Sequence, residues 1–269
     1  MWDATGQYLD DVLYQKAGSY LQTVRYESRR NLLCPLCGGF KAPNFTECYS
    51  CNKNMQQRQT PNGELALADR AAFGVYAVEP NSQTLKMMYG YKEVSPESVD
   101  YRKTVKAIAS LALVGHRSCL EELAKTPLSA WVMVPSTRSS RRFGREHPLH
   151  SILARLLRGV PEVQLVSNQE KTRNLDPDAF SLRESYDNEL LSGNVLLIDD
   201  SWVTGGTVQS AAARLKREGA TQVSVYCISR IVNTNYLGSI DSMSLKAFSR
   251  SVRYARGYCP WNRCIELLH

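Results

Sequence analysis

Two adjacent carboxylates, Asp199 and Asp200, follow a short apolar run at 195–198. An apolar, β-branched run bounded by polar residues is typical of a strand buried on both faces of a parallel sheet. Apolar residues then recur at helical spacing over 208–215, and Gly219 provides a helix stop. This order of strand, loop and helix predicts a βαβ unit with its acids at the carboxyl end of a strand, where open α/β sheets bind ligands.

The loop between that strand and helix contains Thr204, Gly205, Gly206 and Thr207. The glycines let successive backbone N–H groups turn toward one point, and the threonines add hydroxyl donors. The amino end of the next helix adds partial positive charge, so the loop predicts a binding site for a monophosphate. A carboxylate pair would repel a phosphate but accepts hydrogen bonds from a vicinal diol. A diol and a phosphate held by one loop are the features of ribose 5-phosphate.

Two other phosphate-binding motifs are absent from the sequence. It contains neither the G-x-x-x-x-G-K-[ST] loop of P-loop NTPases nor a G-x-G-x-x-G turn after an early strand. An alternative for the two acids is that they bind a metal ion or simply face water, as in receiver-like folds.

Residues 195–207 resemble the signature of type I phosphoribosyltransferases, in which an apolar strand, two acids and three further residues precede a Thr-Gly-Gly-Thr turn. The resemblance implies an α/β fold of that type and a site for 5-phosphoribosyl 1-pyrophosphate (PRPP). Asp199 and Asp200 would hold the ribose hydroxyls. The residues that would hold the 5-phosphate are Ser201, Val203, Thr204, Gly205, Gly206 and Thr207. Trp202 stands where smaller aliphatic residues are more usual, and it either packs beneath the loop or touches the ligand.

Four cysteines form two C-x-x-C pairs, Cys34 with Cys37 and Cys48 with Cys51. Two such pairs in a cytosolic chain are typical of a zinc ribbon with four thiolate ligands. Four sulfurs about 2.3 Å from the metal complete a tetrahedron, so the zinc would be structural rather than catalytic. The alternatives are four buried free thiols, or a ribbon that also holds nucleic acid through nearby basic residues.

A basic segment follows an expected strand at 130–134. It contains Arg138, Arg141, Arg142 and Arg145 together with a glycine. Arginine grips phosphate oxygens in pairs, and a segment at a strand end can face the same crevice as Asp199. The pattern predicts a mobile cationic loop that neutralises a departing pyrophosphate. Nucleic-acid binding is the alternative.

The order of these features along the chain is similar to that in the competence-protein F (ComF) family. The similarity covers residues 31–233 and includes a Tyr-Gly-Tyr-Lys segment that ends at Lys92 and a strand end at Ser136 and Thr137. It implies that Lys92, Ser136 and Thr137 also contact PRPP, and it links the chain loosely to DNA uptake. The residue order at 142–145 departs from the family pattern, so the acceptor substrate stays open.

Four segments are expected along the chain. They are an N-terminal helical segment (1–31), a zinc ribbon (32–58), a phosphoribosyltransferase domain (70–235) and a C-terminal extension (236–269). The first would dock on the body of the protein or on a partner. Apolar patterning predicts strands at 72–78, 84–91, 130–134, 163–166 and 223–228, and helices at 101–124 and 151–158.

The histidines and the remaining cysteines are expected to have structural roles. His116, His147 and His150 are scattered, and each is expected at the surface or in a loop; only His147 adjoins a candidate site. Cys119 and Cys227 are expected in the core. Cys259 and Cys264 are interpreted as packed thiols, because a second metal site would need two further ligands.

The chain has 269 residues, of which 43% are hydrophobic and 22% charged, with a net charge of +7. This length suits one globular domain with an accessory module. No apolar run approaches the ~20 residues of a membrane helix and no secretory signal is visible, so a cytoplasmic location is expected. The positive charge fits a polyanionic small ligand, nucleic acid or a solvated basic surface.

The combined features predict a phosphoribosyltransferase that displaces pyrophosphate from PRPP, with Mg²⁺ on the ligand and a structural Zn²⁺. The predicted catalytic residues are Asp199, Asp200, Arg138, Arg142 and Arg145. The alternative is a non-catalytic protein that senses PRPP or a nucleotide and binds DNA or RNA, in DNA uptake or anti-phage defence. A protein partner or a homo-oligomer is left open.

Overall fold

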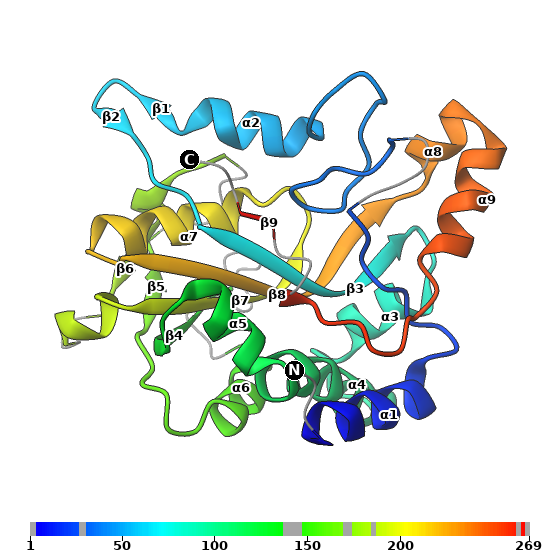
Figure 1. The fold of residues 1–269 in the computed structure, drawn as a ribbon, viewed down its shortest axis with the longest axis horizontal. Coiled ribbons are helices and arrows are strands. Elements are labelled where there is room, and N and C mark those ends of the chain that lie inside the picture. Colours follow the sequence, from blue (N-terminus) through cyan, green and yellow to red (C-terminus); the bar gives the residue numbers. More distant parts are fainter. Residues whose placement is uncertain are drawn as a thin grey trace.

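The centre of the molecule is a five-stranded sheet of order β4-β7-β8-β3-β9 (Figure 1). The computed structural model describes residues 4–26, 31–136, 147–168, 174–183, 187–261 and 265–266. β4, β7, β8 and β3 run parallel, and β9 pairs antiparallel with β3. The strands are β3 (Arg70–Glu79), β4 (Leu128–Met133), β7 (Asn194–Trp202), β8 (Gln222–Asn233) and β9 (Ile265–Glu266). The mainly parallel α/β fold expected from the sequence is confirmed.

The central strand β7 shows why this sheet needs cover on both sides. Val195 and Leu197 are buried in the core on one face, whereas Leu196 and Ile198 are buried in the core on the other. Side chains alternate between the two faces of a strand, so a continuous apolar run demands two apolar layers. The sheet is accordingly enclosed by helices above and below (Figure 1).

One layer consists mainly of helices from the first half of the chain, and the other contains the cysteine-bearing segment and α7. The first comprises α1 (Ala4–Ala17), α3 (Gln83–Gly90), α4 (Pro96–Ser110), the π-helix η1 (Leu111–Gly115), α5 (Arg117–Ala124) and α6 (His150–Leu156). The second comprises α2 (Tyr49–Gln57), α7 (Gly206–Arg217), α8 (Asn235–Ile240) and α9 (Ser242–Ser251). In the described ranges, none of these helices combines the length and apolarity that crossing a bilayer requires.

Short elements complete the second layer. β5 (Leu165–Ser167) and β6 (Phe180–Leu182) form a two-stranded sheet, as do β1 (Gln59–Thr60) and β2 (Gly63–Glu64). The 3₁₀ turns are η2 (Pro177–Ala179) and η3 (Asn188–Leu191).

Three expectations about local structure are wrong. The predicted strand at 84–91 is helix α3, because the Ser82 side chain caps its amino end and accepts from the Leu85 N–H at 3.1 Å. The predicted helix at 101–124 is interrupted at His116, whose φ of −123° and ψ of 24° lie outside the helical region. The strand predicted to end at 228 continues to Asn233 as β8.

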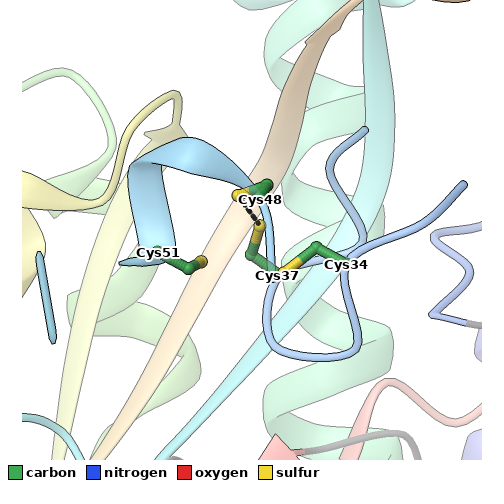
Figure 2. A group of neighbouring side chains, drawn as sticks. All are labelled: Cys34, Cys37, Cys48 and Cys51. Atoms are coloured by element: carbon green, nitrogen blue, oxygen red, sulfur yellow. Dashed lines mark hydrogen bonds between the residues drawn. The ribbon is translucent and has the colours of Figure 1, made fainter. Parts of the chain in front are cut away.

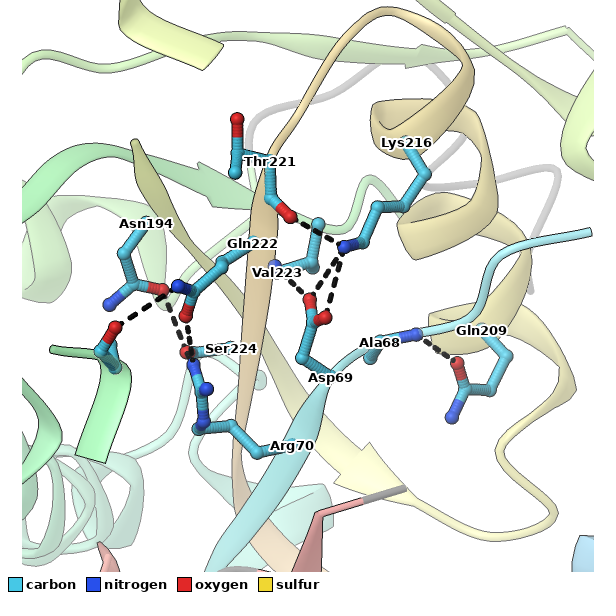
Figure 3. A network of polar contacts seen from close by, with 11 residues as sticks. Ala68, Asp69, Arg70, Asn194, Gln209, Lys216, Thr221, Gln222, Val223 and Ser224 are labelled. Carbon is cyan, nitrogen blue, oxygen red and sulfur yellow. Dashed lines mark hydrogen bonds and ion pairs between the residues drawn. The ribbon is translucent and has the colours of Figure 1, made fainter. Parts of the chain in front are cut away.

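Buried polar side chains clamp the amino ends of β3, β7 and β8 (Figure 3). Arg70 Nη1 donates to Gln222 Oε1 at 3.0 Å and to Ser224 Oγ at 2.9 Å. Ser224 Oγ in turn donates to Asn194 Oδ1 at 2.7 Å. These bonds hold the three strands together at their amino ends, opposite to the carboxyl end of β7.

Asp69 extends this network to α7 (Figure 3). Its carboxylate accepts from Lys216 Nζ at 3.0 Å and from the Val223 N–H at 2.6 Å. Gln209, also on α7, accepts from the Ala68 N–H through Oε1 at 3.0 Å. α7 is therefore anchored on the sheet, and the direction of its amino end is set.

Candidate functional site

A cleft of about 240 Å³ lies at the carboxyl ends of β4 and β7 and beside the end of α3. Its walls come from segments that are far apart in the sequence. It brings together most of the residues predicted to bind PRPP, namely Lys92, Ser136, Asp199, Asp200, Ser201, Val203, Thr204, Gly205 and Thr207. Gly206 is buried as the first residue of α7.

Trp202 packs beneath the loop formed by residues 201–207. The side chain is 2% exposed, and its ring meets Phe73 edge-on with the ring centroids 5.4 Å apart. Gly205 has a φ of +84°, and a Cβ there would lie 2.3 Å from Trp202 Cζ2. Only glycine combines this left-handed backbone with so close an approach of the indole.

The amino end of α7 faces the same loop. The helix begins at Gly206, and its first-turn N–H groups have no partner within the helix. The face of α7 that carries Val208, Ala211 and Leu215 is buried on the sheet. Its first turn lies at the cleft, where Thr207 and Val208 form part of the wall. Orphan N–H groups and the helix dipole make this end suitable for an anion.

Asp200 is surrounded by cationic and donor groups. Lys92 Nζ forms an ion pair with Oδ2, Tyr91 Oη donates to the same oxygen at 3.2 Å, and Ser201 Oγ donates to Oδ1 at 3.0 Å. Burial raises the pKa of Asp200, but the charges of Lys92 and His147 outweigh it, so the pKa lies below its ordinary value. Asp200 is ionised at neutral pH, and the protein already engages both of its oxygens.

Asp199 has the opposite character. Burial and the adjacent charge of Asp200 raise the pKa of Asp199 well above its ordinary value. Its Oδ1 accepts from the Asp200 N–H at 2.7 Å, and the residue stays partly exposed at the wall of the cleft. Of the two acids, Asp199 offers the carboxylate that a ligand reaches more readily.

The histidines differ from expectation in one of three cases, because His147 lies in a loop beside the candidate site, as expected. His147 is 9% exposed, lines the cleft and places Nε2 3.7 Å from Asp200 Oδ2. His116 is fully buried, so its prediction as a surface or loop residue is wrong. His150 is partly exposed and contacts Glu162 at 2.8 Å, as a surface histidine would.

Four cysteines converge from two segments, as Figure 2 shows. All are buried, and their sulfurs lie within 4.8 Å of one another. The Cys37 and Cys48 sulfurs are 3.6 Å apart. Thiolates bound tetrahedrally about 2.3 Å from one Zn²⁺ are separated by roughly 3.8 Å, so the donor set fits a structural zinc ion. The predicted cluster of Cys34, Cys37, Cys48 and Cys51 is confirmed.

Two hydrogen-bond donors reach the cluster, one from the turn after Cys34 and one from β8. The Gly39 N–H donates to Cys37 Sγ at 3.4 Å, and Arg230 Nη2 donates to the same sulfur at 3.2 Å. These donors and the positive charge of Arg230 favour the thiolate form of Cys37. A thiolate is the form that binds metal.

Two buried polar residues behind the loop, Arg230 and Asn54, were not predicted from the sequence. Arg230 contacts Cys37 and the carbonyl groups of the loop, and Asn54 donates to the Thr204 carbonyl. The predicted strand ended before Arg230. A lone arginine in an otherwise uncharged strand is the signal that would have identified it, since a buried charge requires partners.

A second group of possible metal donors is smaller. His116, Cys119 and Cys259 are buried with their ligand atoms within 4.8 Å of one another. Cys119 and Cys227 lie in the core, as predicted. The prediction for Cys264 falls outside the described residues.

The predicted cationic loop also falls outside the described residues. This applies to Thr137, Arg138, Arg141, Arg142 and Arg145, whose roles stay predictions. Ser136, just before them, lines the cleft.

Comparisons with known proteins give limited similarity. No family model matches the chain, and no curated protein matches it. Adenine phosphoribosyl transferase from Trypanosoma brucei, solved with AMP, pyrophosphate and ribose-5-phosphate, is 17% identical with a TM-score of 0.31, and the match covers 61% of this chain and 84% of that chain. The adenine phosphoribosyltransferase from Leishmania donovani is 16% identical with a TM-score of 0.29, and the match covers 62% of this chain and 77% of that chain. At such TM-scores neither similarity determines function, and the resemblance to the ComF family stays a prediction.

Proposed function

We propose that the chain binds PRPP in the cleft at the carboxyl end of β7 and transfers its phosphoribosyl group to an acceptor, with release of pyrophosphate. The observation that carries the proposal is the convergence of Asp199 and loop 201–207 in one cleft. A carboxylate for a diol and N–H donors for a phosphate then stand side by side, as a ribose 5-phosphate moiety requires.

The 5-phosphate would be held by the loop and by the amino end of α7. Backbone N–H groups of the loop, the hydroxyls of Thr204 and Thr207 and the helix dipole all favour an anion there. Ser201 is less suited to this role because its hydroxyl donates to Asp200.

The two acids would divide the work at the ribose. Asp199, partly exposed in the cleft, would accept hydrogen bonds from the 2- and 3-hydroxyls. Asp200 would instead hold Lys92 and His147 in place, since it contacts both. Lys92 would thereby supply fixed positive charge near the ligand.

In the proposed reaction, the bond between ribose C1 and the pyrophosphate oxygen breaks, and its electron pair leaves with pyrophosphate. A nucleophilic atom of the acceptor forms the new bond to C1. The protein positions the reactants and stabilises departing charge, without forming a covalent bond itself. Mg²⁺ would reside mainly on the phosphate oxygens, because it keeps several waters and takes few protein ligands.

Calorimetric titration of the zinc-loaded protein with PRPP and Mg²⁺ tests this proposal. We expect micromolar binding that Asp199→Asn weakens strongly, followed by pyrophosphate release in a screen of candidate acceptors. Absence of binding at millimolar PRPP would contradict the proposal.

A further inference from the structure

Loop 201–207 has a rear face as well as a face toward the cleft, and Arg230 on β8 lies behind it. Arg230 is 4% exposed. Its Nη1 donates to the carbonyl oxygens of Trp202 at 3.1 Å and Val203 at 3.0 Å. Its Nε donates to the Cys37 carbonyl at 2.9 Å, and its Nη2 donates to Cys37 Sγ at 3.2 Å. One guanidinium therefore joins the loop to a cysteine of the cluster.

Asn54 makes a second link between the same two regions. It lies on α2 one turn after Cys51 and is 5% exposed. Its Nδ2 donates to the Thr204 carbonyl at 3.0 Å. Residues three apart on a helix are neighbours on its surface. The same side of α2 thus provides a cysteine to the cluster and an amide to the loop.

Gly39 leaves the space through which Arg230 reaches the cluster. A Cβ at this position would lie 2.0 Å from Arg230 Nη2 and 3.2 Å from Cys37 Sγ. Any side chain at residue 39 would push the guanidinium away from the sulfur. The contact between Arg230 and the cluster therefore depends on a glycine in the first cysteine turn.

The loop carbonyls held from behind fix the direction of the N–H groups that follow them. Within a planar trans peptide unit, the C=O and the next N–H point in opposite directions. Because the carbonyls of Trp202, Val203 and Thr204 accept from Arg230 and Asn54, the next N–H groups point away from the two cysteine segments. We call these segments, which carry Cys34, Cys37, Cys48 and Cys51, the cysteine module. Those N–H groups belong to residues 203–205, which line the cleft.

We propose that the metal-loaded cysteine module, acting through Arg230 and Asn54, is the rear support that turns the loop N–H groups toward a bound phosphate. Loss of the metal then lowers the affinity for phosphoribosyl ligands. This inference rests on the proposed function. Four thiolates with one Zn²⁺ carry a net charge of about −2, which attracts the buried guanidinium of Arg230. This attraction favours a link between the metal-loaded cluster and the loop.

Ribose 5-phosphate binding to substituted, zinc-loaded proteins tests the inference by calorimetry. Arg230→Met keeps an unbranched apolar stem but removes the guanidinium with its donors, and we expect about tenfold weaker binding. Asn54→Leu keeps the branching and the number of side-chain heavy atoms and removes one donor to the loop, and we expect a loss of about threefold.

The chain offers matched controls for both substitutions. Arg70 is a second buried arginine of the sheet, at the opposite end of the strands. Arg70→Met should lower the melting temperature but leave ligand affinity within about twofold, measured well below that temperature. Lys53 adjoins Asn54 but is only partly buried, and it bonds to Asn174 rather than to the loop. Lys53→Met should change neither property.

Zinc affinity provides a readout that does not depend on the substitutions. If zinc raises the affinity for ribose 5-phosphate by some factor, the ligand raises the affinity for zinc by the same factor. Competition with a chromophoric chelator, with and without ribose 5-phosphate, should show this shift in the wild type. Arg230→Met and Asn54→Leu should reduce it.

The outcomes separate this inference from the proposed function. Unchanged ligand affinity in both Arg230→Met and Asn54→Leu, or a zinc affinity that ribose 5-phosphate does not alter, would overturn the inference and leave the function standing. A wild type that binds neither ribose 5-phosphate nor PRPP would overturn both. If Arg230→Met does not fold, Asn54→Leu and the zinc competition decide.

Discussion

The two faces of loop 201–207 are built from different chemical groups. Toward the cleft stand Asp199, Asp200 and Lys92, ionisable side chains whose charges shape one another. At the rear, backbone carbonyls of the loop accept from Arg230 and Asn54. The loop itself contains no charged side chain. Ligand binding at the front therefore depends on the side chains that surround the loop. The contacts at the rear depend on the orientation of the loop's own backbone.

This difference predicts two kinds of substitution. A change at the front to a group that mainly meets the ligand, such as Asp199, should lower affinity while the fold persists; Asp200, which also holds Lys92, is the exception. A change at the rear alters the direction of the loop or the support beneath it, so affinity and stability should fall together. The predictions below run from the largest expected effect to the smallest.

Removal of a metal ligand should have the largest effect. In Cys48→Ser we expect loss of bound zinc and a melting temperature about 10 °C lower, because metal binding to a structural site is part of the folding free energy. Metal analysis and thermal unfolding measure both. Cys227→Ser, which replaces a buried cysteine outside the cluster, should retain one zinc per chain. Full zinc content in Cys48→Ser would contradict a four-thiolate site.

Gly205→Ala should disturb the loop from within. The new Cβ would meet the Trp202 ring at 2.3 Å, at a φ of +84° that alanine adopts at a cost. We expect about 100-fold weaker ribose 5-phosphate binding and a stability loss of about 2 kcal/mol.

Gly219→Ala is the matched control for that substitution. Gly219 has a φ of +101° but nothing within 4 Å of the added Cβ. It should cost about 1 kcal/mol through backbone strain alone and leave binding intact. Equal ligand affinity in the two variants would show that the packing of Trp202 against the loop is irrelevant to binding.

Substitutions of the two adjacent acids should differ in their effects on ligand affinity and on stability. Asp199→Asn should weaken PRPP binding by about tenfold or more with little loss of stability, because an oxygen that would accept from the ribose diol becomes an NH₂ donor. Asp200→Asn should also lower stability by about 2 kcal/mol, since it leaves Lys92 without its buried counter-charge. Calorimetry and denaturant titration of both variants measure these effects. Identical profiles would contradict the division of roles between Asp199 and Asp200.

The pH dependence of stability should distinguish the same pair through the opposite directions of their pKa shifts. The folded-state pKa of Asp199 is raised above its ordinary value of 3.8, so its ionisation costs stability as pH rises from there through the raised pKa. The lowered pKa of Asp200 contributes stability above pH 3.8 that is lost as pH falls through the folded-state pKa. Asp199→Asn should therefore gain relative stability with rising pH. Urea unfolding across pH checks this, and a difference independent of pH would contradict it.

The local motifs were predictable because their chemistry depends on neighbouring residues. The run at 195–198 forms the centre of β7, the acids stand at its end, and Gly206 opens α7. Each assignment uses only the spacing of side chains along a strand or helix. The two cysteine pairs were predictable for the same reason, since each pair lies on a short segment.

Elements with mixed patterns were not predictable to the same degree. Residues 84–91 have apolar positions compatible with either a strand or a helix, and the Ser82 cap decides for α3. The break at His116 lies within a stretch of apolar residues that resembles one long helix. A side-chain cap decides the first case and the backbone angles of one residue decide the second. Apolar spacing along the chain encodes neither.

The sequence by itself determined the strand, the paired acids, the glycine turn and the four cysteines, because short-range geometry fixes each of them. Tertiary structure alone decided that Lys92 and His147 meet Asp200, which leaves Asp199 toward the cleft. It also decided that Arg230 meets Cys37, 193 residues away in the chain. Buried charges find their partners only after the sheet and its layers have packed, so spacing along the chain cannot reveal those partners.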